Sequence, residues 1–349
     1  MDNIILKEDI RQFNLQELKK IIIDLGEKSF RADQIYQWIW NKSATSFDEM
    51  NNISKSFRSI LNEHFEFRPI HLDFQQKSSD GTIKASFKLF DGNIIEGVLI
   101  PADTRMTACI SSQVGCSLSC TFCATGYLER IRNLSPAEIY DQVVQINRIS
   151  KQIYSMPLSN IVLMGMGEPL LNYQNVIQAI KHLISPEGLG MASKRITLST
   201  AGIAKMIKKL GDDQVRFNLA LSLHAANDQK RNQIMPINES NSLKSLSEAL
   251  KYFYKKTNSK ITLEYITFNK FNDSLKDAKE LFNFSKCVPC MVNIIEYNPI
   301  DQANFHKSDV DRLEKFSQFL VEKGVNVRLR SSRGKDIDAA CGQLANKRN

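Results

Sequence analysis

Three cysteines stand close together in the segment CSLSCTFC, where they occupy positions Cys116, Cys120 and Cys123. Thiolates hold iron–sulfur clusters, and a cubane cluster needs four ligands, one for each iron. Three cysteines would therefore leave one iron open to another molecule, as a catalytic zinc site leaves one position open for substrate. The alternative is a zinc site completed by Cys109, seven positions upstream, or by a distant histidine. Zinc ligands more commonly come as two separated pairs, which favours the cluster.

The composition describes the setting in which these thiols act. The 349 residues are 42% hydrophobic and 24% charged, and no apolar run is long enough to span a membrane. The N-terminal segment is too charged for a secretory signal, so the expected location is the cytoplasm, with no membrane partner. Closely spaced thiols in that reducing compartment are more often metal ligands or catalytic groups than disulfides. The formal net charge of +8 suits a polyanionic partner, although many basic proteins bind none.

From about residue 105 the sequence alternates between strand-like and helix-like runs. This alternation predicts an α/β fold with a parallel sheet, curved into an open or partial barrel, whose chemistry lies at the carboxyl ends of the strands. The expected strands fall in 107–113, 160–166, 195–200, 215–224, 260–268, 291–299 and 325–332. One expected helix opens at Ser135 with a capping-box pattern, and the others cover 175–184, 204–211, 242–257, 274–286 and 309–324.

The sequence before this region has a different character. Apolar residues at helical spacing predict helices in 15–30, 31–40 and 53–65. Two strand-like runs in 82–101 are joined by Asp91-Gly92, which is a strong hairpin signal. The predicted organisation is a helical N-terminal domain (1–66), a β-hairpin region (67–104), the alternating core (105–331) and a polar C-terminal tail (332–349).

Short motifs follow several of the expected strands. MGMGEP (164–169), LSTAG (198–202), SLHAAND (222–228) and YNP (297–299) all fall where an α/β fold would bring them to one pocket. Each motif is weak when taken singly, and GMGEP could be only a strand-to-helix turn. Their joint position predicts a binding site beside the cysteine loop.

Together these segments resemble the radical S-adenosylmethionine (SAM) enzymes, whose signature is a C-x3-C-x2-C loop with an aromatic residue before its last cysteine. The resemblance implies a partial (β/α)6 barrel and one [4Fe-4S] cluster on Cys116, Cys120 and Cys123, with SAM chelating the open iron. It also implies seven SAM contacts, which are Gly167, Glu168, Ser199, Ser222, Leu223, His224 and Asn298.

The resemblance narrows to one family, the ribosomal and transfer RNA adenine-C2 methyltransferases, and covers nearly the whole chain. It is carried by GEKSFRADQIYQWIW with SFDEM in the N-terminal region, by RMTACISSQVGC before the cluster, and by DIDAACGQL in the tail. Met166 between the glycines departs from the superfamily pattern but looks normal for the family. The implied partners are 23S rRNA near the peptidyl transferase centre, tRNA at its anticodon loop, and a reductase such as flavodoxin or ferredoxin. A monomer is expected.

By this resemblance Cys341 and Cys109 are catalytic, although a single buried cysteine is most often an inert small hydrophobe. Carbon 2 of adenine has no lone pair with which to attack the methyl group of SAM, whereas a thiolate has one. Cys341 would therefore take the methyl group first. A 5′-deoxyadenosyl radical from a second SAM would remove hydrogen from that methyl, and the carbon radical would add to the base. Attack of Cys109 on the Cys341 sulfur would then form a disulfide and release the methylated RNA.

Three further features leave alternatives open. The resemblance makes Glu96 a proton acceptor, but the strand pattern equally allows an outward-facing side chain. Cys287 and Cys290 form a C-x-x-C pair that could be a second metal or redox motif, although no second pair lies nearby. In 325–330 the valines and Leu329 alternate with Asn326, Arg328 and Arg330, which predicts an apolar and a basic face. That basic face could contact RNA, as could the cations of ERIRN (129–133), or it could be a solvated edge strand.

Two rival functions remain at the level of sequence. An adenine-C8 methyltransferase of the same family would share the cluster, both cysteines and the tail. A non-catalytic, zinc-stabilised RNA-binding protein would instead use the cysteines only as structural ligands. The first rival differs in its RNA product, and the second predicts a colourless protein whose metal survives air.

Overall fold

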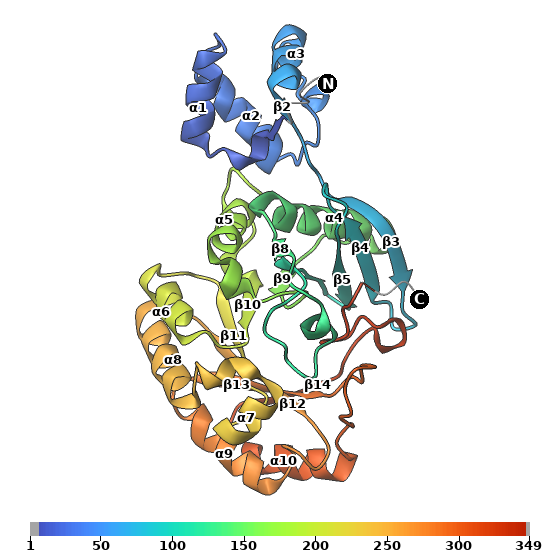
Figure 1. Cartoon of the computed structure of the whole chain (residues 1–349), viewed down its shortest axis with the longest axis vertical. Helices are drawn as coiled ribbons and strands as arrows, with labels where there is room; N and C mark the ends of the chain where they lie inside the picture. Colours follow the sequence, from blue (N-terminus) through green and yellow to red (C-terminus); the bar gives the residue numbers. More distant parts are fainter. Residues whose placement is uncertain (1–6, 347–349) are drawn as a thin grey trace.

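The computed structural model describes residues 7–346, and a small helical domain stands at one end of a larger α/β core (Figure 1). The end residues 1–6 and 347–349, with the tail cations Lys347 and Arg348, lie outside the described part. Short strands β1 (Glu8–Asp9) and β2 (Phe65–Glu66) pair in parallel and close this domain. Its helices are α1 (Leu15–Asp24), α2 (Phe30–Trp40) and α3 (Lys55–His64).

A sheet of ten strands forms the centre of the core, in the order β14-β13-β12-β11-β10-β9-β6-β5-β4-β3. Neighbouring strands are parallel from β6 to β14 and antiparallel from β3 to β6. The predicted hairpin is confirmed as β4 and β5, and its strands continue the core sheet. The strands are β3 (His71–Lys77), β4 (Ile83–Lys88), β5 (Ile94–Ala102), β6 (Arg105–Cys109), β9 (Asn160–Leu163), β10 (Ile196–Thr200), β11 (Asn218–Ser222), β12 (Ile261–Thr267), β13 (Cys290–Glu296) and β14 (Val327–Arg330).

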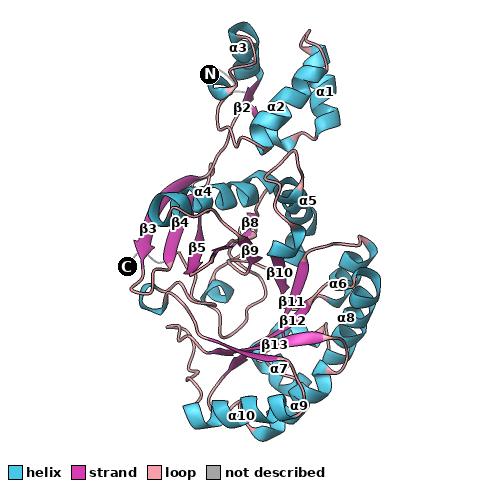
Figure 2. Ribbon diagram, turned by 180° about the vertical axis from the view of Figure 1, so that it is seen from behind, coloured by secondary structure: helices cyan, strands magenta, loops and turns pink. Residues whose placement is uncertain are grey.

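Helices cover the outer face of this sheet, as Figure 2 shows for the arc from α6 to α10. Their buried sides carry Ile, Leu and Phe at helical spacing, which joins them to one continuous core. These helices are α4 (Pro136–Tyr154), α5 (Tyr173–Ile184), α6 (Ala204–Asp212), α7 (Asp228–Ile234), α8 (Leu243–Thr257), α9 (Leu275–Ser285) and α10 (Val310–Glu322). Short 3₁₀ turns are η1 (Ile10–Gln12), η2 (Phe47–Glu49), η3 (Ala124–Tyr127), η4 (Pro169–Asn172), η5 (Ser193–Arg195), η6 (Pro236–Glu239) and η7 (Lys335–Ile337).

All seven strands expected in the core are present, and so are its six expected helices. The pattern missed α7, which is a single polar segment of seven residues, and β3, whose side chains are mostly exposed. The small pair β7 (Gln113–Val114) and β8 (Arg132–Asn133) frames the cysteine loop. Within residues 7–346, no helix is long and apolar enough to cross a membrane.

The C-terminal tail is not simply polar, because it folds back over the open ends of the strands. Its Ile337, Ala339, Ala340 and Leu344 are buried. The amide of Ala124 donates to the carbonyl of Gly342 at 2.7 Å, which ties the tail to the cysteine loop. The fold therefore brings residue 341 next to residues 116–123, which precede it by more than two hundred positions.

Candidate active site

A cavity of about 150 Å³ lies at the carboxyl ends of the core strands, and we call it the strand-end cavity. It is walled by the cysteine loop after β6, by the loops after β9, β10 and β11, by residues of β12, β13 and β14, and by the tail. Cys116, Cys120, Cys123 and Cys341 all line it. The structure thus places the three predicted cluster ligands and the predicted methyl carrier around one space.

The cysteine loop turns sharply at Gly115, whose φ of +74° suits glycine. A Cβ at Gly115 would lie 1.9 Å from the carbonyl oxygen of Glu129, so the two ends of the loop are in close contact. Phe122 packs edge-to-face on His224, with ring centroids 4.8 Å apart, and anchors the loop on the end of β11. This packing holds the three thiols on the cavity wall.

The donor chemistry of the loop fits an iron–sulfur cluster. All three cysteines are free thiols, and burial raises the pKa of each, to about 11 for Cys116. A buried thiol with a raised pKa releases its proton only to a strong partner such as a metal. Among the described residues, no set of three Cys, His, Asp or Glu groups could hold a single metal ion. A cubane spreads its ligands over several irons, so this spacing is no obstacle to a cluster.

Gly167 and Glu168 form a tight turn after β9. Gly167 has a φ of +90°, and a Cβ there would lie 2.4 Å from the Cβ of Gln113. The carboxylate of Glu168 accepts from the amides of Leu170 and Ala201, at 3.0 and 2.7 Å, which closes the turn onto the end of β10. Burial nevertheless raises the pKa of Glu168 above its ordinary value. Both residues line the strand-end cavity.

Three more predicted SAM contacts also line the cavity. Ser199 and Ser222 face each other from β10 and β11, with their hydroxyl oxygens 3.4 Å apart. His224 has a left-handed backbone, and its Nδ1 accepts from the amide of Ile266 at 3.1 Å. Burial lowers the pKa of His224 to about 3, which keeps the ring neutral. A neutral ring whose Nδ1 accepts carries its proton on Nε2.

Leu223 and Asn298 do not line the cavity. The Leu223 side chain is fully buried in the core, and its amide donates to the carbonyl of Glu264. Asn298 donates to the Ser332 hydroxyl at 3.0 Å and to the Cys341 carbonyl at 3.4 Å, so it holds the tail. Its Oδ1 is buried without a partner, which leaves one acceptor for a ligand. The roles of all seven residues toward SAM stay predictions.

Cys109 lies at the end of β6 in a fully buried position behind Cys341. Burial, with a smaller contribution from the nearby Cys341, raises the pKa of the Cys109 thiol to about 12, and the positive charge of Arg330 acts against both. Arg330, on β14, lines the cavity and interacts electrostatically with both cysteines. The two predicted catalytic thiols therefore share one neighbouring cation, and their catalytic roles stay predictions.

Glu96 is fully buried, so the outward-facing interpretation of this residue is wrong. One carboxylate oxygen accepts from the amides of Ala345 and Asn346, at 2.9 and 3.1 Å, and the other lies 3.8 Å from Nζ of Lys84. Glu96 thus fastens the end of the tail and does not line the cavity. Its role as a proton acceptor stays a prediction.

Sequence reasoning missed two polar residues of this site, Glu264 on β12 and Asn293 on β13. Both lie inside apolar runs, and an ionisable residue within a buried parallel strand is the signal that could have identified Glu264. The prediction of one apolar and one basic face for 325–330 was only partly correct. Leu329 is 55% exposed, while Arg330 faces the cavity, because β14 is an edge strand whose end borders the open barrel.

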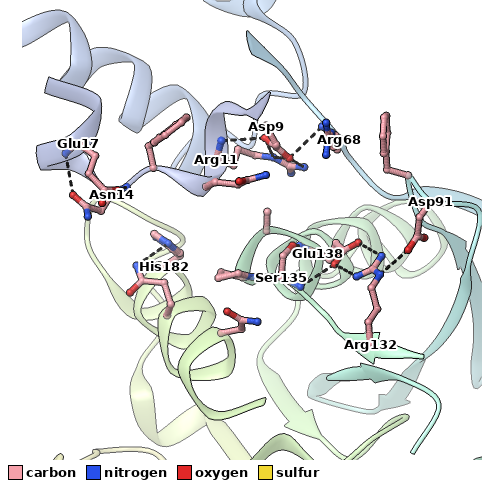
Figure 3. Close-up of a pocket in the computed structure, with 17 residues that line it drawn as sticks. Asp9, Arg11, Asn14, Glu17, Arg68, Asp91, Arg132, Ser135, Glu138 and His182 are labelled. Atoms are coloured by element: carbon pink, nitrogen blue, oxygen red, sulfur yellow. Dashed lines mark hydrogen bonds and ion pairs between the residues drawn. The ribbon is translucent and has the colours of Figure 1, made fainter. Parts of the chain in front are cut away.

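A second cavity, of about 670 Å³, lies between the N-terminal domain and the core, and we call it the junction cavity (Figure 3). Its arginines are engaged in ion pairs with carboxylates. Arg11 lies 2.8 Å from both Asp9 and Asp141, and Arg132 lies within 2.8 Å of both Asp91 and Glu138. Arg132 of ERIRN is therefore held in ion pairs and is not a free cation for RNA.

Comparison with known proteins shows which families this chain is related to. Residues 8–67 match the family model for the ribosomal RNA large subunit methyltransferase N-terminal domain, and residues 110–282 match the radical SAM superfamily. The chain is 60% identical over 98% of its length to a probable dual-specificity RNA methyltransferase RlmN of Cytophaga hutchinsonii, covering 94% of that protein. The chain belongs to the RlmN family. The dual-specificity RNA methyltransferase RlmN of Geotalea uraniireducens is 44% identical to this chain, over 97% of the chain and 96% of its own length.

A solved structure supports the same assignment. The radical SAM methyltransferase of Sphaerobacter thermophilus superposes with a TM-score of 0.91 at 36% identity, over 97% of this chain and 99% of its own. The predicted fold class, a radical SAM partial barrel with an N-terminal helical domain, is thereby confirmed. The RlmN family membership covers the N-terminal domain, the core and the tail alike.

Proposed function

We propose that this protein methylates carbon 2 of adenosine in 23S rRNA and in the tRNA anticodon loop, in the cytoplasm. The observation that supports this proposal most strongly is the arrangement of four thiols around one cavity, three from the loop after β6 and one from the distant tail. A structural zinc site could also use a fourth thiol, but among the described residues no three Cys, His, Asp or Glu groups are placed to hold one metal ion. A methyl carrier beside a cluster needs such a thiol.

The loop cysteines would hold a [4Fe-4S] cluster, and Glu168, Ser199, Ser222 and the Asn298 amide would hold SAM. When bound, the cluster supplies the electron that makes a radical from SAM, and SAM also supplies the methyl group. Burial excludes water from the space between these groups, which protects a reactive species from side reactions. A flavodoxin or ferredoxin would supply electrons, and the protein would act as a monomer.

Cys341 would accept the methyl group as a thiolate, beside the positive charge of Arg330. Cys109 interacts electrostatically with Cys341, which supports the proposal that it would attack that sulfur once the base is attached. The electron pair of the Cys109 thiolate would form the S–S bond, and the pair of the broken carbon–sulfur bond would leave on the methylene carbon, which takes up a proton to become the methyl group of the product. An external thiol or reductase would then restore both thiols. Glu96 would accept a proton at the tail side of the site.

The nearest alternative is methylation at carbon 8, and one experiment separates the two. Protein reconstituted anaerobically with iron and sulfide is incubated with SAM, a reductant and an RNA hairpin that carries the target adenosine. Digestion and mass spectrometry against synthetic standards should detect 2-methyladenosine. Detection of 8-methyladenosine alone would refute the carbon-2 assignment, and a colourless protein with air-stable zinc would refute the whole proposal.

A further inference from the structure

Glu264 presents an acceptor atom that no group of the described chain satisfies. It is 5% exposed and lines the strand-end cavity, where its Oε2 has no hydrogen-bond partner. Buried polar atoms in native proteins are nearly always paired, so an unpaired one that faces a cavity indicates a missing ligand. The orientation of this carboxylate is fixed, because Nδ2 of Asn293 donates to its other oxygen, Oε1, at 2.9 Å.

Arg330 supplies a donor beside this acceptor. It lines the same cavity, and its charge interacts with Cys341 most strongly, then with Glu264 and then with Cys109. The guanidinium therefore lies near both the predicted methyl carrier and the Glu264 carboxylate, on the wall of the same cavity. Burial raises the pKa of Glu264, whereas Arg330 and the Asn293 amide act in the opposite direction and favour the carboxylate form.

The sulfur, the cation and the carboxylate on this cavity wall match in kind the atoms along one edge of adenine. Carbon 2 is bonded to N1, which is a hydrogen-bond acceptor, and N1 adjoins the carbon that bears the amino group, which is a donor. Enzymes that modify a base turn it out of the RNA and recognise its Watson–Crick edge in the pocket. Met164, Ile266 and Ile295 line the same cavity and provide apolar contacts for a flat ring.

We propose that Glu264 and Arg330 recognise the target adenine, with Glu264 Oε2 accepting from the amino group and Arg330 donating to N1. This recognition would place carbon 2 toward Cys341. The inference rests on the proposed function. SAM is the other molecule with an adenine in this site, and Ser222, opposite Glu264 in the strand register, is a predicted SAM contact. Arg330 lies close to both reacting thiols, and this favours the adenine of the RNA over the adenine of SAM as the base that Glu264 and Arg330 bind.

The first test uses the unaltered protein and RNA hairpins that differ at the target position only. Adenosine is compared with purine riboside, which lacks the amino group, and with inosine, which reverses donor and acceptor at both positions. We expect kcat/KM to fall about 10- to 100-fold for purine riboside, and further for inosine. Equal kcat/KM for adenosine and purine riboside would overturn this inference, and this test needs no variant that must fold. Absence of any methylated adenosine would instead overturn the proposed function.

The second test is Glu264→Gln, with Glu322→Gln on the exposed end of α10 as the matched control. Asn293 would keep the amide oxygen, so the new NH2 group would face the amino group of adenine. We expect kcat/KM for adenosine to fall about 10- to 100-fold and the preference over purine riboside to vanish. Methylation of Cys341 by SAM without RNA, detected by mass spectrometry of the tail peptide, should be unchanged. Loss of that methylation would assign Glu264 to SAM, and unchanged preference in the variant would equally refute its role in base recognition.

Discussion

The two cavities of this protein differ most in how their charged groups are partnered. The junction cavity is the larger, at about 670 Å³ against about 150 Å³. Its buried Arg11 is enclosed by two carboxylates, and the residues that line it have no buried polar side-chain atom without a partner. The strand-end cavity holds four free thiols and the unpartnered Oε2 of Glu264. A choice of the active site by cavity volume alone would have selected the junction cavity, which is the wrong one.

The physical reason lies in what each cavity must do. Charges that join two parts of a fold are stable only when every charge has its partner, since a buried unpaired ion is very costly. Groups that receive a ligand must instead keep an unused bonding position until the ligand arrives. The junction cavity is therefore expected to govern stability and the strand-end cavity to govern chemistry. Substitutions in each cavity can test whether stability and chemistry are separated in this way.

The largest effect is expected from Cys341→Ala. This variant should fold and keep a reconstituted cluster, because residue 341 is not among the three loop ligands, but it should form no methylated adenosine. Mass spectrometry of digested RNA measures the product, and absorbance measures the cluster. Cys287→Ala, at a partly buried thiol outside the strand-end cavity, should retain normal activity. Normal product formation by Cys341→Ala would end the two-step scheme.

Cys109→Ala should separate the roles of the two catalytic thiols. Without a resolving thiol, the base should stay attached to Cys341, so protein and RNA should migrate together under denaturing conditions. The double variant Cys109→Ala with Cys341→Ala provides the control, because it has no sulfur to carry the base. Absence of an adduct in the single variant would count against the resolving role.

At the junction cavity, Arg11→Met should act on stability instead. Removal of the arginine leaves Asp9 and Asp141 as buried carboxylates without their cation, and breaking a buried pair in this way costs about 3–5 kcal/mol. The free energy of unfolding in urea measures the effect. Lys19→Met removes a comparable ion pair to Asp33 that is 30% and 48% exposed, and should change stability by less than about 1 kcal/mol. Equal loss in both variants would contradict the division between the cavities.

Most of the fold could be predicted from the sequence because buried parallel strands are short apolar runs with turn signals between them. The cluster cysteines were predictable because their spacing is local. That Glu264 and Arg330 face one cavity was not predictable, since it depends on which strand ends face the barrel interior; the sequence could signal only an ionisable residue in a buried strand and a basic strand face. The docking of the tail depends on contacts such as Gly342 to Ala124, which join residues far apart in the chain and leave no local pattern.

Glu96→Gln should sharpen the assignment of the tail to the strand-end cavity. The variant replaces a carboxylate that accepts from the amides of Ala345 and Asn346 by a neutral amide. Hydrogen bonds to charged groups are stronger than those between neutral groups by about 1 kcal/mol, so the tail should be held less tightly. Burial raises the pKa of Glu96, so the comparison is made at alkaline pH, which favours the carboxylate form. Hydrogen exchange of the tail amides should be about fivefold faster, and unchanged in Glu322→Gln. An unchanged rate in Glu96→Gln would show that this carboxylate does not hold the tail.

The smallest effect is a pH dependence at the junction cavity. His182 stacks on Trp40 with ring centroids 3.7 Å apart, its Nδ1 lies 3.4 Å from the Tyr36 hydroxyl, and its Nε2 lies 3.0 Å from Gln178. Burial, with a smaller contribution from Lys181, lowers the pKa of His182 from 6.5 to about 4. The unfolded chain therefore binds this proton more readily than the folded chain.

Stability contributed by neutral His182 is present above pH 6.5 and is lost as the pH falls toward about 4. Between pH 7 and 5.5 the expected loss in the free energy of unfolding is about 1 kcal/mol. His182→Gln should remove this part of the slope, whereas His71→Gln, at an exposed ring on β3, should retain it. If His182→Gln keeps the full slope, the acid sensitivity arises elsewhere, and the junction is held by its ion pairs alone.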